Sequence, residues 1–244
     1  MHARATATGL FAALLFLPLL APAPLRAQEE RIDTPYRWID RSLRVTPFAG
    51  YVFADRGGLD QGPGSSAIFG ARLRARLSSP LTFELEGGLG SSERYVVDPR
   101  LETGPAIVDE ANVDWLLVQA GFQLALTGAR SYHRIQPYVM VLGGVLQGLG
   151  EETPEAFRDF GLERFRFRIG TTPAFTLGFG AEWDVSDRIG LGLEVRDRIW
   201  RVTTPDGWFD QNILERIEEL GVEAPQESYW TNNIELGAGI SYYF

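Results

Sequence analysis

"IELGAGISYYF", residues 234–244, is the stretch of sequence that decides the fold. In an extended strand, successive side chains point to opposite faces, so every second residue shares a face. One face of this strand carries only apolar or aromatic residues: Ile234, Leu236, Ala238, Ile240, Tyr242 and Phe244. Chain ends are ordinarily polar and poorly ordered. A last strand with this apolar face, ending on an aromatic residue, predicts that the face meets an apolar medium rather than water.

The same alternation recurs along the chain in eight stretches. They are residues 43–55, 65–78, 82–95, 112–127, 134–148, 164–184, 188–203 and 232–244. Each reaches the length of about 9–11 residues that a tilted strand needs to cross a bilayer. Long connections, near 56–64, 96–111, 149–163 and 204–231, alternate with short ones. This order is typical of a transmembrane barrel with short periplasmic turns and long outside loops. We therefore predict that residues 43–244 form an all-β domain, an eight-stranded antiparallel up-and-down transmembrane β-barrel.

The direction in which the two faces point needs a separate argument, because a soluble barrel has the same period with an apolar interior. In the second stretch, Arg72, Arg74 and Arg76 share one face, while the face with Phe69 and Leu73 is apolar throughout. An arginine that faces lipid at the bilayer midplane costs about 2–4 kcal/mol. The arginines are therefore predicted to point inward and the apolar face toward lipid.

The start of the chain is typical of a secreted protein. A short basic beginning, the apolar run "GLFAALLFLPLL" and a small-residue exit predict a signal peptide over residues 1–27. Residues 28–42 are then a periplasmic lead-in. The chain has no cysteine, which argues against a lipid anchor and a disulfide scaffold. The formal net charge of −9 argues against nucleic acid as a partner.

A resemblance to a known family follows from the last strand. Its alternating apolar residues and terminal Phe244 resemble the C-terminal signal of Gram-negative outer-membrane barrels. Residues 43–244 look like the small eight-stranded family typified by the transmembrane domain of outer membrane protein A and the opacity proteins. The resemblance implies that the barrel-assembly machinery recognises Tyr242 and Phe244. It also implies a monomer in the outer membrane of a Gram-negative-type bacterium, in contact with outer-membrane lipids and lipopolysaccharide.

Charged residues on the inward face predict an interior charge network: Arg72, Arg74, Arg76, Glu84, Glu86, Glu182, Glu194, Arg196 and Glu235. A three-residue turn at 79–81 pairs Arg76 with Glu84 and Arg74 with Glu86. The network is either a gate for a narrow ion path or a polar core that neutralises itself. We favour the second interpretation, because buried charges require partners and side chains can fill an eight-stranded interior.

Catalytic and metal-binding residue patterns are missing from the sequence. The single histidine after the signal peptide, His133, lies with Ser131 in a predicted periplasmic turn rather than in a shaped pocket. No spacing of ligands typical of a metal site is present. The outside loops are acidic. Exposure of these acids to solvent explains the charge more simply than divalent cations that bridge the acids to lipopolysaccharide phosphates. We expect no enzyme, no cofactor and no metal.

The fourth long connection contains a helical pattern, Ile213, Leu214, Ile217 and Leu220, with Gly221 as a C-cap. This segment is either a lid on the barrel rim or a candidate partner-binding loop. The sequence thus predicts a non-enzymatic barrel with a structural or surface-interaction role through its extracellular loops. The alternatives are a narrow channel or a conduit for a small hydrophobic ligand, in which Pro173 breaks a strand ladder, and a lipid-modifying enzyme.

Overall fold

The computed structural model describes residues 35–39, 41–101, 104–151, 162–221 and 223–244. The predicted signal peptide and most of the lead-in lie outside the described residues.

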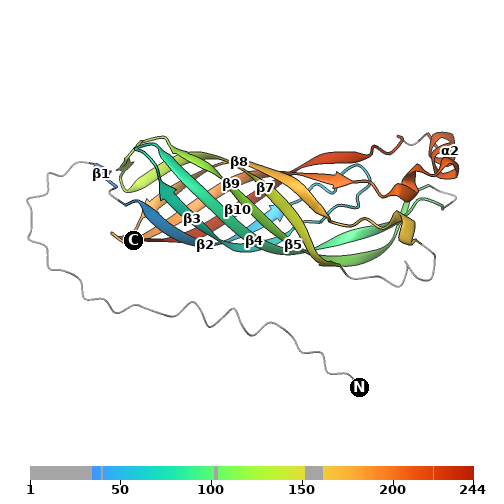
Figure 1. The fold of residues 1–244 in the computed structure, drawn as a ribbon, viewed down its shortest axis with the longest axis horizontal. Helices are drawn as coiled ribbons and strands as arrows, with labels where there is room; N and C mark the ends of the chain where they lie inside the picture. Colours follow the sequence, from blue (N-terminus) through green and yellow to red (C-terminus); the bar gives the residue numbers. More distant parts are fainter. Residues whose placement is uncertain (1–34, 40, 102–103, 152–161, 222) are drawn as a thin grey trace, which may run out of the picture. The chain divides into compact units, whose positions relative to one another are not determined.

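Eight strands close into a barrel (Figure 1). They are β2 (Leu43–Phe53), β3 (Ser66–Arg76), β4 (Leu81–Asp98), β5 (Ala106–Ala125), β7 (Ile135–Glu151), β8 (Thr171–Asp184), β9 (Ile189–Thr203) and β10 (Ser228–Tyr243). Each pairs antiparallel with its neighbour along the chain, and β10 pairs with β2 to close the sheet. The predicted fold class, an eight-stranded antiparallel up-and-down barrel, is confirmed.

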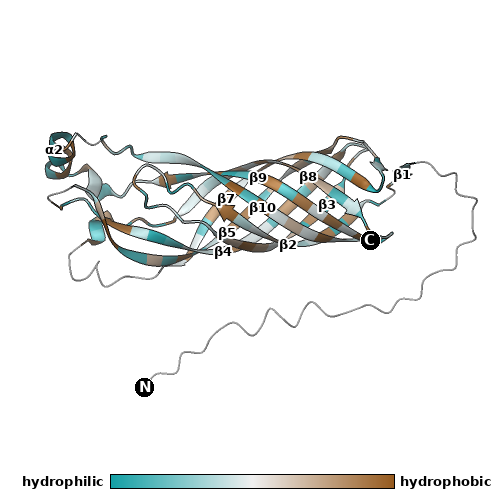
Figure 2. Ribbon diagram, turned by 180° about the vertical axis from the view of Figure 1, so that it is seen from behind, coloured by the Kyte–Doolittle hydropathy of each residue, from teal (hydrophilic) through white to brown (hydrophobic). Residues whose placement is uncertain are grey.

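The two faces of the wall are inverted relative to a water-soluble protein. On β10, Ile240 is 57% exposed, and Phe244 directly after the strand is 69% exposed, whereas Glu235 and Ser241 on the opposite face are fully buried. Figure 2 shows hydrophobic residues over the barrel wall and hydrophilic ones around the end that carries the helix. Exposed apolar side chains with buried charges are what lipid, rather than water, selects. The soluble-barrel alternative is therefore wrong.

The hairpin between β3 and β4 differs from the prediction by one residue. The Leu77 amide donates to the Leu81 carbonyl, 2.9 Å away, so the turn spans residues 78–80 rather than 79–81. The predicted pairs Arg76–Glu84 and Arg74–Glu86 are wrong: Arg74 faces Glu84, Arg72 faces Glu86 and Arg76 faces Thr82. The shift has a physical reason, because it leaves the apolar Leu81 in the wall and puts Pro80, which lacks an N–H, in the turn.

A small ribbon lies at the end of the barrel that carries the C-terminus (Figure 1). Strand β1 (Tyr36–Trp38), from the predicted lead-in, pairs with β6 (Arg130–Tyr132), which adjoins β7. His133 and Arg134 adopt φ values of 48° and 67° in the tight turn between β6 and β7. The end of the lead-in is thus attached to the barrel by a strand pairing.

A cap lies at the end of the barrel opposite the C-terminus, the end predicted to be extracellular (Figure 1). The hairpin of β4 and β5 extends beyond its predicted bounds, into the predicted loop 96–111, and contacts η2 (Glu163–Phe165), η3 (Asp206–Phe209) and α2 (Gln211–Glu219). These elements share a buried apolar cluster: Val96, Val97, Ala111, Leu162, Phe165, Trp208, Ile213 and Ile217. Burial of this cluster explains the longer strands, because it stabilises residues that sequence patterning assigns to a loop.

The part of the barrel interior nearer the cap, which we call the upper interior, is apolar. The sequence analysis did not predict this. Ten buried residues form this core: Phe48, Val52, Ile68, Trp115, Leu117, Leu146, Phe167, Ala174, Trp200 and Val202. The rings of Trp115 and Trp200 lie 6.2 Å apart. Gly90 makes room for them, since a Cβ there would come within 2.2 Å of the Trp115 ring. The lumen therefore has an apolar upper part and a charged lower part.

Candidate functional site

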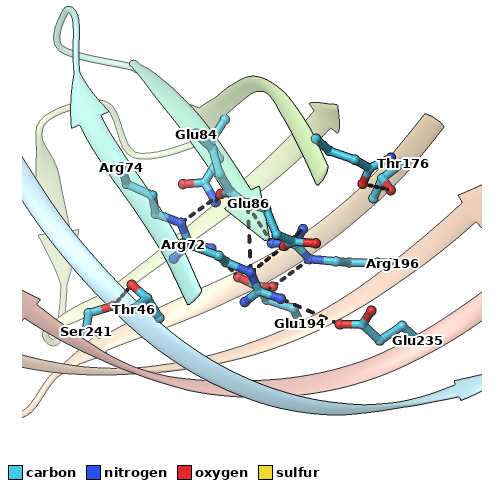
Figure 3. Close-up of polar contacts among 12 residues, drawn as sticks. Thr46, Arg72, Arg74, Glu84, Glu86, Thr176, Glu194, Arg196, Glu235 and Ser241 are labelled. Atoms are coloured by element: carbon cyan, nitrogen blue, oxygen red, sulfur yellow. Dashed lines mark hydrogen bonds and ion pairs between the residues drawn. The ribbon is translucent and has the colours of Figure 1, made fainter. Parts of the chain in front are cut away.

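The lower lumen contains a network of five arginines and five glutamates (Figure 3 shows its centre). The members, all buried, are Arg44, Arg72, Arg74, Arg196 and Arg198 with Glu84, Glu86, Glu182, Glu194 and Glu235. Strands β2, β3, β4, β8, β9 and β10 contribute, so the contacts tie distant parts of the wall together. The equal number of opposite charges makes this group neutral as a whole.

Arg196 on β9 is the centre of the network. Its guanidinium donates to three carboxylates, those of Glu84 at 2.8 Å and of Glu86 and Glu194 at 2.7 Å each. One arginine thus joins β9 to β4 across the lumen. Arginine suits this role, because its planar fork carries several donors in a fixed geometry and stays charged when buried.

Two arginines of β3 complete the middle layer. Arg72 lies 2.6 Å from Glu86 and 2.7 Å from Glu194, and its guanidinium lies 3.7 Å from the centre of the Phe48 ring. Arg74 lies 2.7 Å from Glu84 and 2.5 Å from Glu194. Glu194 therefore bridges both arginines to β9.

The network extends up and down the lumen. Above, Arg198 contacts Glu86 at 2.7 Å and also pairs with Glu235. Below, Arg44 lies 3.0 Å from Glu182. The Tyr138 hydroxyl donates to Glu194 at 2.5 Å, which adds a β7 side chain to the group.

The structure brings together every predicted network residue except Arg76. The Arg76 guanidinium lies lower and donates to the Ile39 carbonyl, a contact with the lead-in. Sequence reasoning missed Arg44, Arg198 and Tyr138. Arg44 lies two residues before Thr46, and Arg198 lies two residues after Arg196, so each shares the inward face of its neighbour and could have been predicted from the strand period. Nothing in the sequence indicated which face of its strand Tyr138 takes.

These contacts pair the buried charges of the lower lumen with one another. Buried charges are tolerated when their partners satisfy them, and breaking such a pair costs about 3–5 kcal/mol. An eight-stranded interior is just wide enough for side chains to fill. The geometry therefore fits a self-neutralised core that locks the strands together.

A second site, a cavity of about 240 Å³, lies in the wall at the upper end of β8. Residues 164–170, predicted as strand, do not belong to β8, which begins at Thr171. The last pair of β8 with β9 is Ala174 with Trp200, whereas β9 continues to pair with β10 up to Thr203. Burial of Phe165 and Phe167 accounts for the late start of the strand, and the missing N–H of Pro173 accounts for the end of its pairing with β9 at Ala174.

Both faces of the wall contribute to this cavity, which we call the wall pocket. Leu146, Phe167 and Trp200 are buried side chains of the upper core, whereas Arg168 and Arg201 are exposed. The Trp200 indole Nε1 is buried and has no hydrogen-bond partner among the described residues. The wall pocket therefore combines an apolar floor, an unused donor and two cations.

The cap surface is the third feature. Helix α2 buries Ile213 and Ile217, leaves Leu220 exposed and holds Leu214 half-buried. Arg216 of this helix donates to the Arg100 carbonyl at 2.9 Å. Arg100 in turn donates to the Asp98 carboxylate at 2.9 Å, and this hydrogen bond raises the pKa of Arg100. The cap is thus held by polar contacts as well as by its apolar cluster.

Ser131 lies in β6 of the small ribbon, and His133 lies in the turn that follows it. The His133 ring is exposed and packs 4.4 Å from the Tyr132 ring, whereas Ser131 is fully buried. In the part of the chain that the structure describes, no group of three or more His, Cys, Asp or Glu residues is arranged to hold a metal ion. No helix within the described ranges has the length and apolarity to cross a membrane.

Comparisons with known proteins bear on the fold alone. No protein-family model matches the chain, and no curated protein does. The outer membrane protein OprG from Pseudomonas aeruginosa is similar in structure, with a TM-score of 0.52 and 12% identity over 84% of this chain and 96% of that one. Outer Membrane Protein W of E. coli matches with a TM-score of 0.47 and 12% identity, over 84% of this chain and 98% of that one. Neisserial surface protein A matches with a TM-score of 0.46 and 12% identity, over 83% and 97%. The likeness to OprG shows that the chain shares the fold of an outer-membrane β-barrel.

Proposed function

We propose that this outer-membrane barrel is a non-enzymatic protein whose sealed body anchors a structured extracellular cap used for surface interaction. The observation that carries the proposal is the apolar cluster of the cap, in which Trp208 is fully buried. Long loops that bind no partner have no need of a packed core. A loop that does bind a partner gains affinity when it is held rigid before it binds.

The three alternative functions, a narrow channel, a ligand conduit and a lipid-modifying enzyme, have less support. A narrow channel requires an open path, and the ten charged side chains of the network occupy the lumen. A conduit through the wall pocket meets the same obstacle below the upper core. For a lipid-modifying enzyme, the exposed ring of His133 lies in a turn, without the enclosed site that a general base requires.

The chemistry of the exposed side of α2 indicates the kind of partner. Glu215, Glu218 and Glu219 are exposed there, beside the exposed apolar Leu220. An acidic surface with one apolar contact suits a basic partner, because charge complementarity steers association and desolvated apolar area adds affinity. In this proposal Ile213 and Ile217 hold the helix in place, while Leu214 and Leu220 belong to the contact surface.

A binding experiment with a defined cationic probe tests the proposal. The protein is reconstituted into phosphatidylcholine vesicles, which carry no net charge, and binding to an immobilised decalysine peptide is measured by biolayer interferometry. Reversing Glu215, Glu218 and Glu219 to lysine should weaken binding about tenfold or more. The matched control reverses Glu93, Glu110 and Asp114, three exposed acids of the β4–β5 hairpin, and should change binding about twofold at most. Equal losses in both variants, or no binding by the wild type, would contradict the proposal.

Assembly is part of the same proposal. Tyr242 and Phe244 lie on the lipid-facing side of β10, with ring centroids 5.1 Å apart. Both rings are exposed on the last strand and remain accessible to the barrel-assembly machinery before insertion. After insertion they contact outer-membrane lipid at the periplasmic interface, where aromatic residues are favoured.

A further inference from the structure

We infer that the wall pocket binds a single-chain amphiphile with an anionic head group, such as a carboxylate or a phosphate on a hydrocarbon chain. This site lies in the barrel wall, apart from the exposed side of α2, and the inference does not rest on the proposed surface interaction. Four features of the pocket carry it: its apolar floor, its unused hydrogen-bond donor, its charge and its position.

The floor of the pocket accepts hydrocarbon. Leu146, Phe167 and Trp200 belong to the apolar upper core and are almost completely buried. The cavity volume of about 240 Å³ equals about eight water molecules at about 30 Å³ each. That is below the range of about 300–1,000 Å³ for pockets that enclose a drug-sized ligand. The pocket therefore suits the end of one chain with its head group and is too small for a whole multi-chain lipid.

An acceptor is needed at Trp200. Its Nε1–H lies in a residue with only 2% exposure, and the described residues offer it no acceptor. Leaving such a donor unpaired costs about 1–3 kcal/mol. Thr171, Thr172 and Thr203 also line the pocket. The Thr171 hydroxyl already donates to the side-chain oxygen of Gln147, and the Thr172 hydroxyl donates to the Arg201 carbonyl at 3.1 Å. A ligand oxygen seated here would satisfy the indole and accept from the Thr203 hydroxyl.

The charge of the pocket selects an anion. Arg168 and Arg201 line it, and no carboxylate does. Within the described part of the chain, Arg201 makes no ion pair, and the one ion pair of Arg168 is a 3.7 Å contact with the half-exposed Glu163. Two arginines at the rim with little competition from acids match the bidentate chemistry of carboxylate and phosphate groups.

The position of the pocket explains how such a ligand reaches it. Below it on the outer face lie the exposed apolar residues Phe175 and Leu177, and the Phe175 ring lies 6.1 Å from the ring of Trp230. Aromatic residues of this kind mark the membrane interface. The opening thus lies where hydrocarbon chains of the outer leaflet meet their head groups. Because the charge network fills the lumen further down, the ligand is held rather than passed through.

Photolabelling of the purified, folded protein in an uncharged maltoside detergent tests the inference. The probe is decanoate that carries a diazirine on its chain, and labelled peptides are identified by mass spectrometry. We expect saturable labelling of the segment 167–173. Unlabelled decanoate or decyl phosphate should compete with the probe, and decanol, which has the same chain without the charge, should not. Whether the carboxylate or the phosphate competes better identifies the natural head group.

Three variants make the test specific. Gly170→Leu adds a side chain at the pocket where a new Cβ meets no atom within 4 Å, so it should block labelling without disturbing the fold. Gly87→Leu is the matched control, because Gly87 lies in the wall of β4, away from the pocket, with the same free space. The double change Arg168→Gln with Arg201→Gln should weaken competition by decanoate about tenfold. Labelling that does not saturate, equal competition by decanol, or unchanged labelling in Gly170→Leu would overturn the inference.

Discussion

Replacement of Arg196 by methionine should lower the free energy of unfolding by about 3–5 kcal/mol. Methionine matches the unbranched stem of arginine but lacks the guanidinium and carries no charge. The change removes hydrogen bonds to Glu84, Glu86 and Glu194, which lie within 2.7–2.8 Å of the guanidinium. Breaking one buried ion pair costs about 3–5 kcal/mol, because the abandoned partner remains buried and charged. Three abandoned partners would cost more, but each carboxylate keeps a second arginine, Arg72, Arg74 or Arg198, so the sum stays within this range.

The assay is equilibrium unfolding in urea from phospholipid vesicles, followed by tryptophan fluorescence and by the gel mobility of unheated samples. Arg188→Met is the matched control, since Arg188 is an exposed arginine in the turn between β8 and β9. It should change stability by about 0.5 kcal/mol or less. Adding Glu86→Gln to Arg196→Met removes one abandoned charge and should recover part of the loss. A loss below about 1 kcal/mol for Arg196→Met, or no recovery in the double variant, would refute the view that the network holds the strands together.

The remaining predictions concern assembly, the cap and the lipid-facing wall. Phe244→Ala should reduce the amount of folded protein in the outer membrane of cells, yet leave refolding of the purified chain into detergent unchanged. Trp208→Ala should expose the cap to added protease while the barrel keeps its heat-dependent gel mobility, because this fully buried ring lies in the apolar cluster of the cap and loss of a core tryptophan costs about 3–5 kcal/mol. Leu73→Arg places a charge on the lipid face of β3 and should destabilise the barrel by about 2–4 kcal/mol in vesicles.

Sequence patterning was sufficient for the barrel because the membrane imposes a strict alternation. Lipid on one side and paired charges on the other leave few acceptable residues at each position. The sequences of strands such as β3 and β10 therefore predict which side chains face lipid and which face the lumen. The hairpin at residues 78–80 shows the limit of this signal. If β4 slides by two residues along β3, every side chain stays on the same face of the sheet, so the alternation of apolar and polar residues does not distinguish the two registers. Only the hydrogen bonds of the turn decide whether Arg76 faces Glu84 or Thr82.

The parts that escaped prediction depend on contacts between distant segments. Sequence patterning left open which face of the wall Trp115 and Trp200 take, and only the structure shows that they meet in an apolar upper core. The late start of β8, and with it the wall pocket, results from burial of Phe165 in the cap and Phe167 in the core. The helical spacing of Ile213 and Ile217 did predict α2, although only the structure shows which surface covers its apolar side.

The sealed lumen is the central claim, and the most direct test is conductance across planar bilayers. The protein is first shown to be folded by its different gel mobility before and after heating, and it is then inserted into bilayers in a sulfonate-buffered chloride solution. The account predicts no steady conductance from the wild type, because five arginines and five glutamates fill the lower lumen with their own ion pairs. A stable, ohmic conductance from folded protein would contradict it and would make the charge network the lining of a channel.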